Sequence, residues 1–241
     1  MQTVKLFCLP YAGGSAAVFA QWQQYLDPRI RLVPVELAGR GRRIKDPLYG
    51  SLSDAMNDAF RIITNSIDGS SYAIMGHSMG SLIAYEVAQK IRTANIPQPS
   101  HVFFSGHGAP HIPLKEDKKF NLMTDAEFKK EMIALGGTPP EFFQYPELME
   151  LFLPLLRSDF AIAETEIHTR EIRPLDCNIT IFHGKKDDLT AGQSDDWKCH
   201  TLKNCRIHYF EGGHFFINEE IAEITRLINE TLLFADILHS F

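Results

Sequence analysis

Apolar residues along this chain fall into short runs separated by segments with helical spacing. Six runs are typical of strands, and they cover residues 5–9, 31–37, 72–75, 101–105, 178–183 and 205–210. Helical segments are expected at residues 19–26, 53–67, 81–88, 196–202 and 219–238. Strands that alternate with helices are typical of a mostly parallel sheet with helices on both faces, so the pattern predicts an α/β fold.

Two of these helices carry clear sequence signals. In the segment 53–67, Met56, Phe60 and Ile63 recur at helical spacing, and Ser53 is expected to cap its start. In the segment 219–238, the apolar stripe is equally regular. It consists of Ile221, Ile224, Ile228, Leu232 and Ala235.

The alternation stops between residues 107 and 173, where the pattern is mostly helical. Residues 124–127 form a capping box, and the helix after it should end at Gly136-Gly137. Residues 146–156 are apolar nearly all round, and Pro154 should bend or stop that helix. We therefore expect one domain over 1–241 with residues 107–173 inserted as a helical lid, the alternative being that these helices only complete the core.

Composition narrows the class of protein. The chain has 241 residues, of which 44% are hydrophobic and 22% charged, as in an ordinary globular domain. A net charge of -6 argues against a general nucleic-acid binder, because no basic surface is available to neutralise a run of phosphates. The sequence contains no apolar run of membrane length and no signal-like segment at its start, so we expect a cytoplasmic protein without a membrane partner.

The four cysteines, Cys8, Cys177, Cys199 and Cys205, have no short paired spacing typical of a zinc site. Cys8 lies inside an apolar run, where a buried thiol is expected. The cysteine pattern therefore predicts free thiols in a reducing compartment and no bound metal.

A Gly-x-Ser-x-Gly motif interrupts the apolar run at residues 72–88 and marks Ser78 as the candidate nucleophile. A sharp turn between strand and helix would expose the Ser78 hydroxyl, and Gly76 and Gly80 would leave room for the neighbouring backbone. The motif alone is also compatible with an inert serine in a Gly-rich turn. A second Gly-rich turn follows the first strand, and there the amide of Ala12, together with that of Met79, could bind a negative oxygen.

Candidate partners of Ser78 follow two later strands. Asp187 and Asp188 come after the strand at 178–183, and His214 comes after the last strand. The order serine, acid, histidine is that of α/β-hydrolases, in which the histidine acts as general base and the acid orients it. The residues favour Asp187 over Asp188 but leave the choice open.

Several motifs together make the chain resemble a type II thioesterase, the stand-alone α/β-hydrolase that accompanies nonribosomal peptide and polyketide synthases. The motifs are LPYAGGS at 9–15, ELAGRGRR at 36–43, GHSMG at 76–80, LGGTP at 135–139, LPLLRSDF at 153–160 and GGH at 212–214. The chain departs from the family at Ala38, where proline is frequent, and at 185–189, where Asp-Pro is frequent.

The resemblance implies a site and a substrate. It places the acid on Asp187 and the oxyanion donors on Ala12 and Met79. It also implies hydrolysis of acyl or aminoacyl thioesters on the phosphopantetheine arm of a peptidyl or acyl carrier protein. We expect a monomer without a cofactor. The basic loop with Arg40, Arg42 and Arg43 is the expected contact for the carrier or for the phosphate of its pantetheine arm, although such a loop can also be a solvated or structural turn.

Two alternatives stay open. One is a medium-chain thioesterase that releases fatty acids from a fatty acid synthase, since relatives of that type share the motif and the triad order. The other is an inactive hydrolase fold that serves as a binding module. A general carboxylesterase would leave the arginine-rich loop unexplained.

Overall fold

One parallel sheet forms the centre of the computed structural model, which describes residues 3–113, 119–136, 145–165, 171–190 and 192–234. Its order is β2-β1-β3-β4-β5-β6, and all neighbouring strands are parallel. The strands are β1 (Val4–Leu9), β2 (Ile30–Pro34), β3 (Tyr72–His77), β4 (His101–Ser105), β5 (Asn178–Gly184) and β6 (Cys205–Phe210). The predicted α/β class is confirmed.

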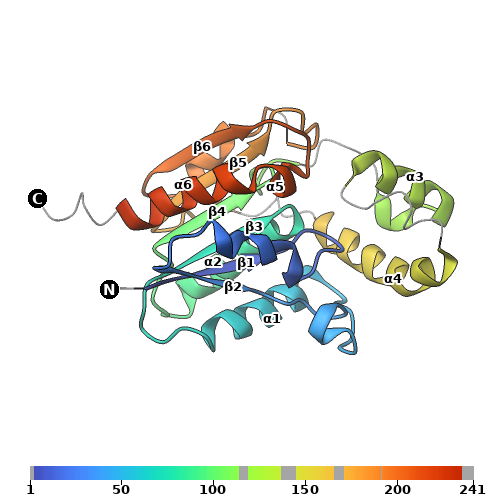
Figure 1. Cartoon of the computed structure of the whole chain (residues 1–241), viewed down its shortest axis with the longest axis horizontal. Coiled ribbons are helices and arrows are strands. Elements are labelled where there is room, and N and C mark those ends of the chain that lie inside the picture. Colours follow the sequence, from blue (N-terminus) through green and yellow to red (C-terminus); the bar gives the residue numbers. More distant parts are fainter. Residues whose placement is uncertain (1–2, 114–118, 137–144, 166–170, 191, 235–241) are drawn as a thin grey trace, which may run out of the picture.

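Helices cover both faces of the sheet (Figure 1). Those on one face are α1 (Leu52–Thr64), α2 (Met79–Thr93) and the 3-10 helix η5 (Asp195–His200), and those on the other are η1 (Ala16–Gln24), α5 (Phe216–Glu219) and α6 (Ile221–Phe234). Strand β1 shows the two cores most simply. Phe7 and Leu9 pack with α1 and α2, whereas Leu6 and Cys8 pack with η1 and α6, because successive side chains of a strand point to opposite faces.

Among the described residues between β4 and β5, the chain forms the 3-10 helix η3 (Phe120–Leu122) and the helices α3 (Asp125–Leu135) and α4 (Pro146–Ala163). Helices α3 and α4 stand at one end of the molecule (Figure 1). They share a small core of their own around Phe128, Met132 and Leu156. The capping box of α3 is confirmed, with Thr124 and Glu127 bonded reciprocally, and Gly136 follows the last helical residue, while Gly137 lies outside the described residues.

Of the two outcomes expected at Pro154, a bend or a stop, the stop is wrong. Helix α4 continues past this proline to Ala163. A proline removes one N–H from the helix and displaces the carbonyl four residues earlier, and both Pro154 and Glu150 are exposed, so water can satisfy that carbonyl. Beyond the proline, Leu155 and Ile162 are buried, and this packing holds the second half of the helix in place.

Other element boundaries also differ from the expectations. The N-cap of α1 is Ser51 rather than Ser53, because the Ser51 hydroxyl accepts the backbone N–H of Asp54 at 3.1 Å. The segments expected as helices near 19–26 and 196–202 are the 3-10 helices η1 and η5. The last helix begins at Ile221 after the single turn of α5, and its expected end after residue 234 lies outside the described residues.

All four cysteines are free thiols, as predicted. Cys8 and Cys177 are buried, and burial raises the pKa of the Cys177 thiol to about 12. None of the helices in the described part of the chain combines the length and the hydropathy that a bilayer crossing requires.

Candidate active site

Ser78 sits in a strained turn between β3 and α2. Its backbone has φ +54° and ψ -120°, a conformation that residues other than glycine rarely adopt. A Cβ at Gly76 would lie 2.1 Å from the carbonyl oxygen of Gly80, and a Cβ at Gly80 would lie 2.2 Å from that of Leu9. The two glycines are therefore required for the close packing that supports this turn.

The structure brings His214 and Asp187 to Ser78. The His214 Nε2 atom lies 2.9 Å from the Ser78 Oγ atom, and the Nδ1 atom lies 3.0 Å from Asp187 Oδ2. With the proton on Nδ1, the imidazole donates to Asp187 and accepts from Ser78, so both contacts fit one tautomer. Both His214 and Asp187 are buried, whereas Asp188 is exposed, and it is Asp187 that contacts the histidine.

Further contacts hold the Asp187 carboxylate in place. The backbone N–H of Leu189 donates to its Oδ1 at 3.1 Å, and the Thr190 hydroxyl donates to its Oδ2 at 3.1 Å. Burial raises the pKa of Asp187, but the hydrogen bond and charge of His214, with these two donors, outweigh it and leave the pKa below its ordinary value. Asp187 is therefore ionised at neutral pH.

Ala12 and Met79 lie beside Ser78, as the sequence predicts. Both residues line the cavity into which Ser78 and His214 open. Within the described part of the chain, neither backbone N–H has a hydrogen-bond acceptor. Met79 also begins α2, where the helix dipole is positive. The two amides are available for a negatively charged oxygen next to Ser78.

The cavity at Ser78 is small and mostly apolar. Its volume is about 110 Å³. Helices η3, α3 and α4 supply part of its wall through Phe120, Leu135 and Phe160. A second cavity of about 280 Å³ also reaches His214 and Leu135, and it is lined further by Lys186 and Asp188.

Arg40 corrects the expectation for the basic loop. Its side chain is 2% exposed, and its guanidinium makes a bidentate ion pair with Asp159 of α4, at 2.6 and 2.7 Å. A buried, paired guanidinium cannot contact a carrier protein. The Asp159 carboxylate also accepts the Gly13 N–H at 2.7 Å, and Arg40 donates to the Gly14 carbonyl at 3.0 Å. The pair thus fixes the Gly-rich turn that contains Ala12.

The other two arginines differ from each other. Arg43 is partly buried and binds Asp46 at 2.7 Å and Asp58 at 2.5 Å, so it belongs mainly to the packing of the loop on α1. Arg42 is exposed, and among the described residues no ion pair involves its side chain. Of the three arginines predicted to bind a carrier, only Arg42 is fully accessible.

Sequence reasoning missed Asp159 and Thr190, the residues that position the turn and the acid. Asp159 is the only acidic residue in the LPLLRSDF motif and lies between apolar stretches of α4, at 151–156 and 160–163. An acid in such a segment needs a buried cationic partner, which was the available signal. Thr190 gives no comparable signal, because its role depends on the turn that follows β5.

Comparisons with known proteins agree with this geometry. A family model described as a thioesterase domain matches residues 4–232. Linear gramicidin dehydrogenase LgrE of Brevibacillus parabrevis is 35% identical over 233 residues, which are 95% of this chain and 88% of the relative. Thioesterase PikA5 of Streptomyces venezuelae is 32% identical over 231 residues, which are 95% of this chain and 81% of the relative.

Two further similarities bear on the substrate. The medium-chain S-acyl fatty acid synthase thioesterase of Homo sapiens is 30% identical over 230 residues, or 92% of this chain and 83% of the relative. The crystal structure of ClbQ from the colibactin NRPS/PKS pathway superposes with a TM-score of 0.92 at 33% identity and covers 98% of this chain and 99% of that chain.

Proposed function

Because the chain belongs to the thioesterase domain family, we propose that it hydrolyses acyl or aminoacyl thioesters on the phosphopantetheine arm of carrier proteins. In this role it regenerates misprimed or stalled nonribosomal peptide and polyketide synthases. The names of PikA5 and ClbQ support such a pathway. The observation that carries the proposal is the 2.9 Å contact between Ser78 Oγ and His214 Nε2 inside a covered cavity.

The proposed mechanism assigns a role to each residue of the site. His214 takes the Ser78 proton while Ser78 Oγ attacks the thioester carbonyl, and Asp187 stabilises the imidazolium. The amides of Ala12 and Met79 bind the oxygen that becomes negative. As the C–S bond breaks, His214 returns the proton to the leaving thiolate. A water molecule then attacks the acyl carbonyl while His214 takes its proton. His214 passes this proton to Ser78 Oγ as the ester bond breaks and the acyl group leaves as an acid.

A lid over this site is part of the proposal. Helices η3, α3 and α4 would cover the acyl group, and the second cavity at Lys186 and Asp188 would admit the pantetheine arm. Support comes from the two cavities, which meet at His214 and Leu135. We further propose a single domain over 1–241 that acts as a cytoplasmic monomer without a cofactor. The free thiols support a reducing compartment, and sedimentation would measure the oligomeric state.

The name of LgrE raises an oxidoreductase alternative, which the first βα turn disfavours. Nicotinamide-binding folds carry Gly-x-Gly-x-x-Gly after the first strand, where the backbone approaches the pyrophosphate. Here β1 is followed by PYAGGS, and Gly-x-Gly-x-x-Gly occurs nowhere in the 241 residues. The serine, histidine and aspartate arrangement instead suits acyl transfer.

The fatty acid synthase relative supports a second candidate, release of medium-chain acyl groups. The cavity at Ser78 measures about 110 Å³, whereas pockets that bury a drug-sized ligand measure about 300–1,000 Å³. We therefore expect short acyl groups to be preferred. Rates on a series of acyl-pantetheine thioesters from acetyl to dodecanoyl would test this, and a maximum at medium chain length would favour the second candidate.

Arg42 is the residue that we propose for contact with an acidic carrier. The protein itself carries a net charge of -6, so a local basic patch has to offset the long-range repulsion. Arg42→Ala should slow hydrolysis of acyl-carrier protein at low salt, where exposed charges are least screened. Hydrolysis of a free acyl-pantetheine analogue should be unaffected, because this substrate has no carrier to bind. Arg29→Ala is the matched control, since Arg29 is an exposed arginine on another loop. Equal effects on both substrates would exclude Arg42 as the docking residue.

A further inference from the structure

Three side chains suited to metal binding meet outside the active-site cavity. They are His111, in the segment after β4, and Cys199 and His200, in η5. One ring nitrogen of each histidine and the Sγ atom of Cys199 all lie within 4.8 Å of one another. About ninety residues separate His111 from the other two, so only the fold brings them together.

The three side chains lie near enough to one another for small side-chain shifts to form a zinc site. In tetrahedral zinc coordination, two nitrogen ligands lie ~3.3 Å apart and a nitrogen and a sulfur lie ~3.6 Å apart. His111 Nδ1 and His200 Nε2 are 2.8 Å apart, so the two rings need to separate slightly to admit the ion. His111 is half-buried and Cys199 is exposed, which leaves both side chains free to adjust and provides a path from solvent. We propose that His111, Cys199 and His200 bind one zinc ion, in contrast to the expectation from the cysteine spacing that no metal is bound.

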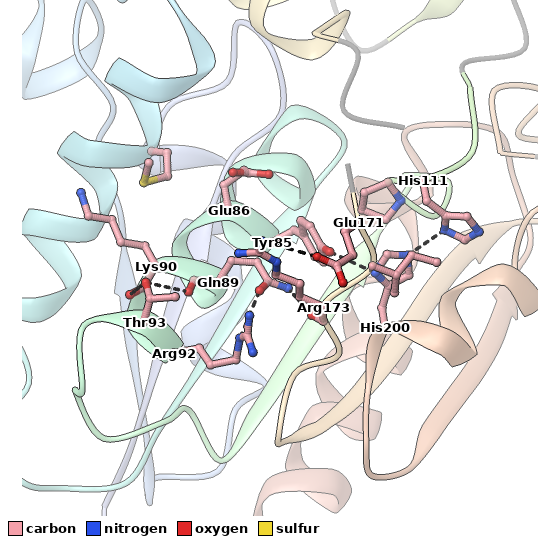
Figure 2. A pocket seen from close by; sticks show the side chains of 13 residues that line it. Tyr85, Glu86, Gln89, Lys90, Arg92, Thr93, His111, Glu171, Arg173 and His200 are labelled. Carbon is pink, nitrogen blue, oxygen red and sulfur yellow. Dashed lines mark hydrogen bonds and ion pairs between the residues drawn. The ribbon is translucent and has the colours of Figure 1, made fainter. Parts of the chain in front are cut away.

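Tyr85 orients the buried ligand His200. Its hydroxyl contacts the Nδ1 atom of His200 at 3.1 Å, so the Nε2 atom of the same ring faces His111 (Figure 2). The ring of His200 also packs edge-on against Tyr85, with 5.2 Å between centroids. A hydrogen bond on the non-coordinating nitrogen is the usual outer contact of a zinc-bound histidine, because it fixes the tautomer and the ring.

Zinc binding at this place has a simple proton balance. In the ion-free protein, one proton lies between His111 Nδ1 and His200 Nε2, and the Cys199 thiol donates to the Asp196 carbonyl at 3.0 Å. On binding, the proton of His111 moves through solvent to its other nitrogen, and Cys199 releases its proton to bind as a thiolate. Three protein ligands leave a fourth position for water, as in zinc sites with an open coordination position.

The proposed site lies at the base of the segment 107–173. His111 belongs to the start of that segment, and Glu171–Arg173, at its end, line the same cavity of about 480 Å³ as His111, Tyr85 and His200 (Figure 2). Among the described residues, none lines both this cavity and the cavity at Ser78. A zinc ion here would link the start of the segment to η5, so we expect it to stabilise the fold without taking part in hydrolysis.

Metal titration of the full-length, tag-free and chelator-treated protein tests the proposal. We expect one equivalent of Co²⁺ to give a thiolate-to-cobalt charge-transfer band, and one equivalent of Zn²⁺ to displace it and raise the Tm. Mg²⁺ should do neither, because it prefers oxygen ligands. Tyr85→Phe should weaken Zn²⁺ binding by about 10-fold or more, the usual cost of losing an outer contact.

Two cysteine variants make the test specific. Cys199→Ser should abolish the charge-transfer band and the Tm increase, whereas Cys205→Ser, which changes a cysteine of β6 outside the group, should retain both. His111→Gln should weaken Zn²⁺ binding at least about 10-fold while circular dichroism stays unchanged. Absence of the band in the unmodified protein, or a band that survives Cys199→Ser, would overturn the assignment. So would equal zinc affinity in His111→Gln and the unmodified protein.

Discussion

Two adjacent acids after β5 differ in burial, and this difference separates their roles. Asp187 is 3% exposed and bonded to His214, whereas Asp188 faces solvent. Adjacent residues of a turn point in different directions, so only one acid of such a pair contacts the histidine. The sequence favours Asp187 and leaves the choice open, because the contact with His214 depends on the fold.

Asp187→Asn should lower the turnover of a thioester substrate by up to ~10⁴-fold, because an amide at this position favours the wrong tautomer of His214. Asp188→Asn should change turnover little, since its side chain is exposed. Steady-state kinetics of both variants, with circular dichroism to verify folding, would measure this. A larger loss in Asp188→Asn would assign the acid to that residue.

The Arg40–Asp159 pair shows what a residue's type does not reveal. An arginine in a Gly-rich basic loop is usually solvated. Arg40 is buried because α4 places Asp159 against it, and this contact depends on the fold. Since removal of one partner leaves a buried, unpaired charge, the remaining ion is strongly unfavourable. The same pair supports the turn with Ala12, so stability and catalysis are coupled here.

Asp159→Ala should reduce the free energy of unfolding by about 3–5 kcal/mol, the usual cost of breaking a buried ion pair. Arg42→Ala, two residues from Arg40 but exposed, should change it little. Urea unfolding of the two variants provides the comparison. If Asp159→Ala unfolds at the same urea concentration as Arg42→Ala, the pair does not support the fold.

At the scale of helices and strands, the two helices α3 and α4 between β4 and β5 pack against different parts of the molecule. Helix α3 packs through Phe128 and Met132 onto α4, whereas the end of α4 reaches the main core through Ile162. The hydrophobic pattern predicts both helices and the capping box of α3. It did not predict that α4 continues past Pro154, because the packing that holds the second half of α4 comes from distant residues.

Hydrogen exchange should therefore be fast in α3 and slow in the strands. Residues packed only in a small satellite core open more readily than those of a central sheet. We expect the amides of α3 to exchange before those of β3 and β5, with the end of α4 in between. Exchange measured by mass spectrometry would check this order, and equal protection of α3 and β3 would argue against a lid that opens.

At the scale of the whole molecule, the α/β class follows from the sequence pattern. The meeting of the candidate site residues follows from it too, because each comes after a strand and parallel strands place their carboxyl ends at one edge of the sheet. The thioesterase family model and the superposition on ClbQ agree with that pattern. Burial could not be predicted in the same way. Histidine is of intermediate burial by type, yet His77, His101 and His183 are all buried within strands of the sheet.

These buried histidines should make the protein less stable in acid. Burial lowers the pKa of His101 to about 3 and of His183 to about 4, and it lowers the pKa of His77 well below the ordinary value. In the unfolded chain they take up protons near pH 6.5, whereas the folded protein excludes them. The free energy of unfolding should therefore fall as the pH drops from 7 towards 4.

Urea unfolding at pH 7.5 and pH 5 would measure this effect. His101→Gln, which keeps a polar group near Thr180, should reduce the difference between the two pH values. An unchanged midpoint at pH 5 would mean that these histidines accept protons without loss of the fold.

The central claim is that Ser78 forms the acyl-enzyme in thioester hydrolysis, and it is tested most directly by intact-protein mass spectrometry. The unmodified protein, after reaction with a fluorophosphonate, should carry one adduct on Ser78, and Ser78→Ala should carry none. The same variant should hydrolyse an acyl-carrier thioester at least roughly 10⁴-fold more slowly. An adduct on another residue, or full hydrolysis by Ser78→Ala, would contradict the account and would favour a binding module or a different nucleophile.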